Sequence, residues 1–175
     1  MSVFFCTYLP REIPHAMGAS VVGLCSVTDE TIPDAEKDLP RNLCPLIKSS
    51  YGFAKTDKCP FFYFSDLIVG ETTCDGKKKK CMRCWLSSSR SMSLNCPTAR
   101  QKPAYGLYRQ ELIRFKEVLE TKFGTVITED AIRRQIHNRN KILAALNRLQ
   151  YVMALDPAPA WVWISSTLFT AQDLR

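Results

Sequence analysis

Hydrophobic residues occur in short blocks along the first half of the chain and at helical spacing along much of the second half. Residues 3–9, "VFFCTYL", are short, aromatic and β-branched, and residues 20–27, "SVVGLCSV", are similar, so both predict buried strands. Between them "PREIPHAMGA" carries a proline near its front, which favours a helix start. The strand–helix–strand order predicts an α/β architecture.

The next blocks extend this pattern. The polar stretch "DETIPDAEKDLP" predicts a loop or a short helix, and residues 42–55, "NLCPLIKSSYGFAK", predict a helix that begins near Asn42 with Pro45 in its first turn. Residues 61–70, "FFYFSDLIVG", predict a strand that ends at Gly70. The following "ETTCDG" would then lie at the carboxyl end of that strand, where open α/β sheets bind ligands.

The second half contains two helical patterns separated from the first half by a stretch without a period. "CMRCWLSSSRSMSLNCPTARQKP" predicts a loop, whereas residues 107–124 predict a helix that ends at Gly124. Residues 127–155 predict a second helix with Thr128 as N-cap. Its apolar stripe is expected to pack, and its members are Ile132, Ile136, Leu143, Leu146 and Leu149.

Composition narrows the class of protein. The chain has 175 residues, of which 46% are hydrophobic, which suits a packed globular core. It has no apolar run long enough for a membrane span, and its first residues lack the basic and apolar regions of a signal peptide, so we expect a cytoplasmic protein. In that compartment its eight cysteines are expected as metal ligands, redox groups or buried thiols, not disulfides.

The net charge of +7 invites a nucleic-acid interpretation, but the charge is unevenly placed. Residues 80–103 contain five basic side chains and no acidic one, and so supply most of the excess. The lysine run from Lys77 to Lys80 lacks interleaved aromatic residues that would stack on bases. A solvated face is therefore the simpler interpretation of this run, and nucleic acid is not the expected partner.

The cysteine spacing leaves several kinds of site open. Cys44, Cys59 and Cys74 lie fifteen residues apart beside predicted helix or strand ends, and converging thiolates suit an iron–sulfur cluster or zinc. Buried structural cysteines are the alternative. A second possible site is zinc held by Cys81 and Cys84, which are spaced C-x-x-C, with Cys74, Cys96 or both, in a small basic module that contacts nucleic acid.

Longer motifs carry a resemblance. Residues 38–79 contain "NLCPLIKSSYGF" and "GETTCDGKKK", and this segment closely resembles the 2-hydroxyacyl-CoA dehydratase family, in its subunits related to the D-component. The resemblance extends through "FFCTYLPREIPHAMGA" and, more loosely, through both predicted helices of the second half. Residues 80–103 and 160–175 do not share it.

The resemblance implies a fold, a cofactor and partners. Family members have two α/β lobes, so this chain would be part of a Rossmann- or flavodoxin-like lobe with a helical C-terminal segment. By resemblance, Cys44 and Cys74 match cluster ligands, and Cys59 matches the extra cysteine of double-cubane members, so the cofactor would be a [4Fe-4S] or double-cubane cluster. The implied partners are an ATP-dependent activator and a dehydratase-like subunit in a homo- or heterodimer, with an acyl-CoA or small substrate. Catalytic side chains are not assigned, and the chain on its own is expected to be inactive.

The two stretches outside the resemblance suggest a change of reading frame. In the family "DGKKK" is followed by a segment like Met-Tyr-Glu, which a shifted reading of permitted codons after Lys80 reproduces. The same offset gives family-like residues within 94–103 and 161–172. The predicted organisation is therefore an α/β lobe over 1–79, an irregular out-of-frame stretch over 80–103, a helical part over 104–159 and an out-of-frame tail over 160–175. A non-functional fragment is the remaining alternative.

Overall fold

Four short strands form a parallel sheet in the computed structural model, which describes residues 2–4, 9–24, 28–73, 91–97, 102–157 and 159. The order across the sheet is β2-β1-β3-β4. The strands are β1 (Ser2–Phe4), β2 (Val21–Gly23), β3 (Leu67–Glu71) and β4 (Ser91–Leu94). This is the order of the first four strands of flavodoxin-like sheets, so the predicted α/β class is confirmed.

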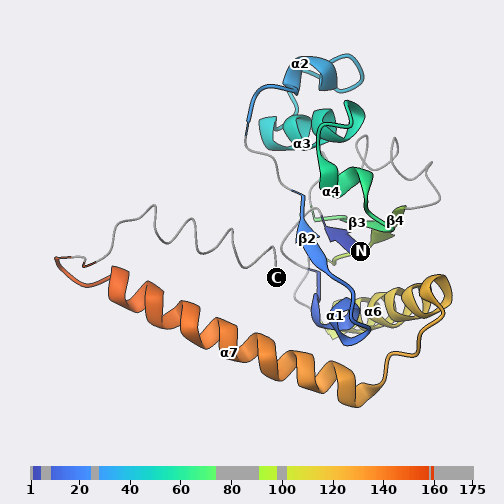
Figure 1. Ribbon diagram of the computed structural model, residues 1–175, viewed down its shortest axis with the longest axis vertical. Coiled ribbons are helices and arrows are strands. Elements are labelled where there is room, and N and C mark those ends of the chain that lie inside the picture. Colours follow the sequence, from blue (N-terminus) through green and yellow to red (C-terminus); the bar gives the residue numbers. More distant parts are fainter. Residues whose placement is uncertain are drawn as a thin grey trace.

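Helices lie on both sides of this sheet. Figure 1 shows α2, α3 and α4 on one side, and α1, α6 and α7 on the other. Their bounds are α1 Glu12–Ala16, α2 Ile32–Ala35, α3 Pro45–Lys55, α4 Pro60–Tyr63, α6 Lys102–Phe123 and α7 Glu129–Met153. Over the described ranges, no helix combines the length and the apolar character needed to cross a membrane.

Strand alternation assigns the core residues to the two faces of the sheet. Leu67 and Val69 of β3 are buried in the same cluster as Phe115 and Leu119 of α6, both of which are fully buried. Ile68, on the opposite face of β3, packs in the cluster that contains Phe62 of α4. The larger core therefore lies between the sheet and α1 and α6.

The strand predicted over residues 61–70 is partly wrong. Its aromatic half forms α4, and β3 begins only at Leu67 and continues past Gly70 to Glu71. The physical reason is Pro60, whose fixed φ suits the first position of a helix. The hydroxyl of Ser65 then donates a hydrogen bond of 2.8 Å to the carbonyl of Phe62, which satisfies a backbone acceptor at the end of this turn.

The irregular stretch predicted over residues 80–103 also contains regular structure. β4 pairs with β3 in the register Ile68↔Ser91 and Glu71↔Leu94, and α6 begins at Lys102 instead of near residue 107. Met92 and Leu94 are buried, whereas Ser91 and Ser93 are only partly so. This alternation covers four residues among many serines, which is too short a pattern to distinguish from a loop.

The structure tests two predicted helix starts and one predicted helix end. α3 begins at Pro45, three residues later than expected, because the residue before a proline is biased to extended backbone and Cys44 has ψ 128°. The N-cap predicted at Thr128 is confirmed, since its hydroxyl accepts from the backbone N–H of Ala131 at 3.3 Å. Gly124, with φ 62°, follows the last residue of α6 as predicted.

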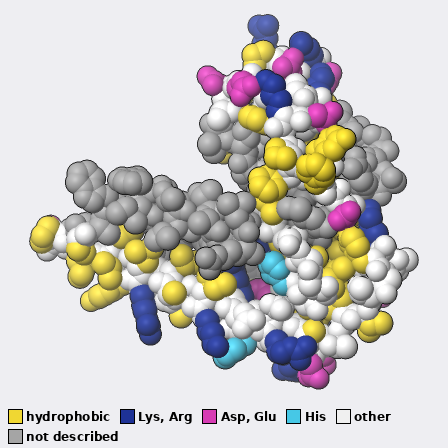
Figure 2. Space-filling model, in the orientation of Figure 1, with side chains coloured by type: hydrophobic (Ala, Val, Ile, Leu, Met, Phe, Trp, Pro, Cys, Tyr) yellow, Lys and Arg dark blue, Asp and Glu magenta, His cyan; other side chains and the backbone are white. Residues whose placement is uncertain are grey.

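The packing role expected of the second long helix is only partly correct. Ile132, in the first turn of α7, packs against the main core. Farther along the stripe Ile136 is 45% exposed and Leu143 is 41% exposed, whereas Leu146 and Leu149 are half-buried. Figure 2 shows hydrophobic side chains along the visible side of α7, with basic side chains beside them.

Candidate functional site

Cys44 is the N-cap residue of α3 and its thiol is exposed. The chain enters the helix through extended backbone at Cys44, and Pro45 occupies the first helical turn. Cys44 makes no side-chain capping hydrogen bond. Its sulfur is therefore presented at a fixed helix end and is not part of a disulfide.

Cys59 has the same local arrangement at α4 but a different environment. It is the N-cap residue of a helix that begins with Pro60. Its side chain is half-buried and packs against the cluster formed by Leu24 and Phe62. Cys59 consequently contributes to packing, and its sulfur is better shielded from water than that of Cys44.

The structure places these two thiols apart. Cys44 directly precedes α3, and Cys59 follows it after a short turn in which the N–H of Lys58 bonds to the carbonyl of Phe53 at 3.2 Å. α3 has eleven residues, which at about 1.5 Å of rise per residue makes a rod of roughly 16 Å. Cys44 and Cys59 thus flank opposite ends of this helix.

Cys74, the third predicted ligand, lies outside the described residues, as do Cys81 and Cys84. Within the ranges that the structure describes, no three His, Cys, Asp or Glu side chains are grouped so that they could hold a metal ion. Cys96, from the alternative zinc set, is half-buried against the main core. The described residues include Cys44 and Cys59 of the first set and Cys96 of the second, so the convergence of either complete set stays a prediction.

The carboxyl end of β3 is nevertheless well fixed. The N–H of Thr72 donates to the carbonyl of Leu94 at 3.1 Å, and the N–H of Cys96 donates to the hydroxyl of Thr72 at 3.1 Å. These bonds continue the pairing of β3 and β4 beyond Glu71. β1 and β3 are the neighbours at which the strand order reverses, and the crevice outside such strand ends is where ligands bind in open α/β sheets.

Glu71 and Tyr108 are polar residues beside this edge that the sequence pattern did not indicate. Glu71 is fully buried and shares a strand face with Leu67 and Val69. Burial raises the pKa of Tyr108, and the nearby Cys96, Glu71 and Glu12 raise it further. The alternation of β3 would have revealed Glu71 if the strand had been extended past Gly70.

A buried lysine contacts the segment that leads to Cys44. The ammonium of Lys48 donates to Oε1 of Glu36 at 2.7 Å and to the backbone carbonyl of Arg41 at 2.9 Å. Its hydrogen bond to Glu36 lowers the pKa of that carboxyl group. Lys48 lies in a largely apolar run, and nothing in its spacing indicated this role.

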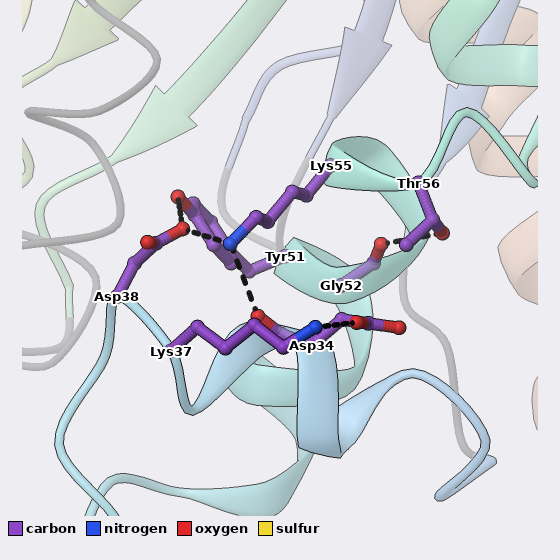
Figure 3. Close-up of polar contacts among 7 residues, drawn as sticks. All are labelled: Asp34, Lys37, Asp38, Tyr51, Gly52, Lys55 and Thr56. Carbon is purple, nitrogen blue, oxygen red and sulfur yellow. Dashed lines mark hydrogen bonds and ion pairs between the residues drawn. The ribbon is translucent and has the colours of Figure 1, made fainter.

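A second polar group joins the other end of α3 to the segment after α2 (Figure 3). Lys55 donates to Oδ2 of Asp38 at 2.6 Å, and the hydroxyl of Tyr51 donates to the same oxygen at 2.9 Å. The bond from Lys55 lowers the pKa of Asp38, and the bond from Tyr51 adds to this effect. Lys37 and Asp34 form a separate pair on the exposed side at 2.7 Å.

The sulfur atoms of Cys44 and Cys59 are each of a kind that can ligate an iron–sulfur cluster. Cys44 and Cys59 offer soft sulfur atoms that are free of disulfides, and such atoms are the ligands that iron–sulfur clusters take. Cys44 is also accessible from outside the fold. A cluster at Cys44 would take its further ligands from residues outside the described ranges or from another chain.

Comparison with known proteins gives two matches. The family model described as 2-hydroxyglutaryl-CoA dehydratase, D-component, matches residues 6–172. Over 155 residues the chain is 51% identical to an Escherichia coli (strain K12) protein named "Putative dehydratase subunit YjiM". The aligned part is 87% of this chain and 40% of that relative, so the chain spans two fifths of the relative's length.

Proposed function

The chain belongs to the 2-hydroxyglutaryl-CoA dehydratase D-component family, and from this we propose that it supplies cysteine ligands to an iron–sulfur cluster in a dehydratase-type subunit. The observation that carries the proposal is the family match from residue 6 to residue 172, which includes Cys44, Cys59 and Cys74. The exposed position of Cys44 at the start of α3 supports it. In this proposal Cys44 and Cys74 are ligands of one cluster, and Cys59 is an additional ligand of a double-cubane type.

The proposed activity is that of a full-length family member, and this chain spans two fifths of the length of its E. coli relative. It is removal of water from a 2-hydroxyacyl-CoA thioester, or low-potential reduction of a small substrate, which is the activity that resemblance to the double-cubane members would imply. An ATP-hydrolysing activator would supply the electron, and a dehydratase-like subunit would complete the dimer. When bound, the iron–sulfur cluster supplies one-electron chemistry at a potential set by burial and hydrogen bonds.

The described residues support each of the three proposed cysteine ligands in a different way. The entry to α3 holds Cys44 at a fixed helix end, and packing around Phe62 shields Cys59 from water. The pairing of Thr72 with Leu94 and Cys96 fixes the backbone two residues before Cys74. We place the assembly in the cytoplasm.

Anaerobic purification of the full chain tests the proposal. Expected results are a brown protein that contains iron and acid-labile sulfide, and a loss of both in Cys44→Ser. Cys96→Ser is the matched control, because Cys96 packs against the core and is not in the proposed set. A colourless protein with stoichiometric zinc that is lost in Cys96→Ser would contradict the cluster and favour the zinc module.

We also propose that residues 80–103 and 160–175 are encoded out of frame, although the family match from residue 6 to residue 172 runs through the first stretch and most of the second. The five uncompensated basic residues of the first stretch and its C-x-x-C pair would then have no selected role. The strand β4 lies within this stretch. Met92 and Leu94 of this strand are buried in the main core, so the stretch as encoded both pairs with β3 and packs against the core.

A further inference from the structure

The ion pair between the buried Lys48 and the partly exposed Glu36 is not used by the proposed function. The Lys48 side chain is 8% exposed, and its Nζ lies 2.7 Å from Glu36 Oε1. Lys48 is the buried member of the pair, because the Glu36 side chain is 26% exposed, and removal of Glu36 would leave a desolvated ammonium without its carboxylate. The exposed pair of Lys37 and Asp34 has no such consequence.

The contacts of Lys48 converge on the segment that precedes Cys44. Its ammonium donates to the carbonyl of Arg41 at 2.9 Å, three residues before Cys44. Its own backbone N–H donates to the carbonyl of Cys44 at 3.1 Å. The guanidinium of Arg41 lies 3.7 Å from the other oxygen of Glu36. The carboxylate of Glu36 therefore contacts both Arg41, before Cys44, and Lys48, after it.

We propose that Lys48 is a positioning residue that holds the backbone of residues 41–44, and with it the cluster ligand Cys44, at the start of α3. The inference rests on the proposed function for the role of Cys44 as a ligand. Lys48 itself does not touch the cluster in this proposal. It acts through the carbonyl of Arg41 and the helix turn that begins at Cys44.

Lys55 provides a matched control on the same helix. Its ammonium also joins α3 to the α2 side, through Asp38 at 2.6 Å and the carbonyl of Asp34 at 3.2 Å. It lies at the end of α3 remote from Cys44. Lys48→Met and Lys55→Met therefore each remove one ammonium between the same elements, but only the first affects the segment before Cys44.

Hydrogen exchange of the full chain without metal tests the positioning itself. Exchange of the backbone N–H groups within residues 41–48 other than Pro45, which has none, should become about tenfold faster in Lys48→Met, because the carbonyl of Arg41 and the carboxylate of Glu36 lose their donor. Lys55→Met should leave these amides unchanged. Equal exchange of this segment in the two variants would overturn the proposal, whether or not the protein binds iron.

Loss of iron to a chelator tests the consequence for the ligand. The anaerobically purified protein with Lys48→Met should lose iron about tenfold faster than the unaltered protein, as expected when groups that orient a ligand are removed. Lys55→Met should match the unaltered protein, and an equal rate in all three would overturn the role in ligation. Absence of iron from the unaltered protein would refute the proposed function and leave the exchange result as the test of positioning.

A milder variant protects this test against misfolding. If circular dichroism shows that Lys48→Met is unfolded, Glu36→Gln keeps an acceptor for Lys48 but removes the charge. We expect the same selective change at residues 41–48, smaller than in Lys48→Met. An unchanged segment in a folded Glu36→Gln, together with an unfolded Lys48→Met, would overturn the proposal in favour of a general stabilising role.

Discussion

The carbonyl oxygen of Thr31 occupies the space that a side chain at Gly52 would need. A Cβ built on Gly52 would lie 2.2 Å from that oxygen and 2.6 Å from the Thr31 Cβ. Thr31 is itself fixed, because its hydroxyl donates to the carbonyl of Ser49 at 2.9 Å. α2 and α3 therefore approach each other closely only because position 52 is glycine.

Gly52→Ala should destabilise the protein by about 3 kcal/mol, since a rigid backbone atom cannot give way to the added methyl group. Urea unfolding of the two proteins measures this difference. Gly106→Ala is the control, because Gly106 lies within α6 with no atom near its Cβ position. It should stabilise the protein by about 1 kcal/mol through helix propensity, and similar effects of the two changes would contradict the steric argument.

Acid should weaken the contact between α2 and α3. Hydrogen bonds from Lys48 and Lys55 lower the pKa values of Glu36 and Asp38 respectively. A carboxyl group whose pKa is lower in the folded state stabilises the fold above its unfolded pKa, and this contribution is lost as the pH falls through the folded value. The free energy of unfolding should therefore decrease below about pH 4. The free energy of unfolding of Asp38→Asn should decrease less over the same pH range than that of the unaltered protein. Identical pH profiles of the two proteins would refute the assignment of this acid sensitivity to Asp38.

Glu71→Gln should lower the pKa of Tyr108. Burial is the largest cause of the raised value, but the charge of Glu71 contributes, and the substitution removes that charge without opening the site. The pKa is measured by following ultraviolet absorbance as the pH is raised, and subtraction of the same curve for Tyr108→Phe isolates the signal of this tyrosine. Glu12→Gln should have a smaller effect, because Glu12 contributes less than Glu71. A larger effect of Glu12→Gln would show that Glu71 is not the stronger of the two influences on the pKa of Tyr108.

Phe115→Ala should cost about 3–5 kcal/mol of stability, because a fully buried ring is replaced by a cavity between α6 and the sheet. Thermal or urea unfolding measures the loss. Ile142→Ala, on the open side of α7, removes a side chain that is 45% exposed. Its expected effect is below about 0.5 kcal/mol, and a comparable loss in the two variants would show that the outer part of α7 is packed in solution.

Resequencing of the gene across codons 74 to 175 tests the proposed change of frame. The expected result is a shift at the codons of the lysine run that ends at Lys80, followed by a return near Pro103. Repair of the frame should replace the basic residues of 80–103 with a less basic segment. An intact frame, with relatives that encode Cys81 and Cys84 in the same places, would refute the proposal.

Much of the fold could be predicted from local patterns. The α/β class and the boundary signals at Thr128 and Gly124 depend on local chemistry, which a sequence displays directly. The strand assigned to residues 61–70 failed in its aromatic half because aromatic residues suit strands by propensity, whereas Pro60 and tertiary packing selected a helical turn. β4 was missed because only its neighbour β3 distinguishes it from a loop.

The candidate site was less predictable than the fold. Cysteine spacing selected Cys44 and Cys59 as candidate ligands, and this stays a prediction. Their separation by α3 depends on a helix that spacing alone does not measure. Lys48, Glu71 and Tyr108 become relevant only through partners far away in sequence, such as Glu36 for Lys48. A pattern read along the chain does not contain such pairs.

The position of β1 in the sheet has a consequence for synthesis of the protein. β1 leaves the ribosome before β2, β3 and β4, yet it lies between β2 and β3, and Ser2 pairs with both Val21 and Leu67. The first pairing closes a loop of about twenty residues, whereas the second must wait until more than sixty have been made. During translation β1 therefore has one free edge for most of the time needed to make the α2–α4 segment, and this is the interval in which nascent chains would pair with one another.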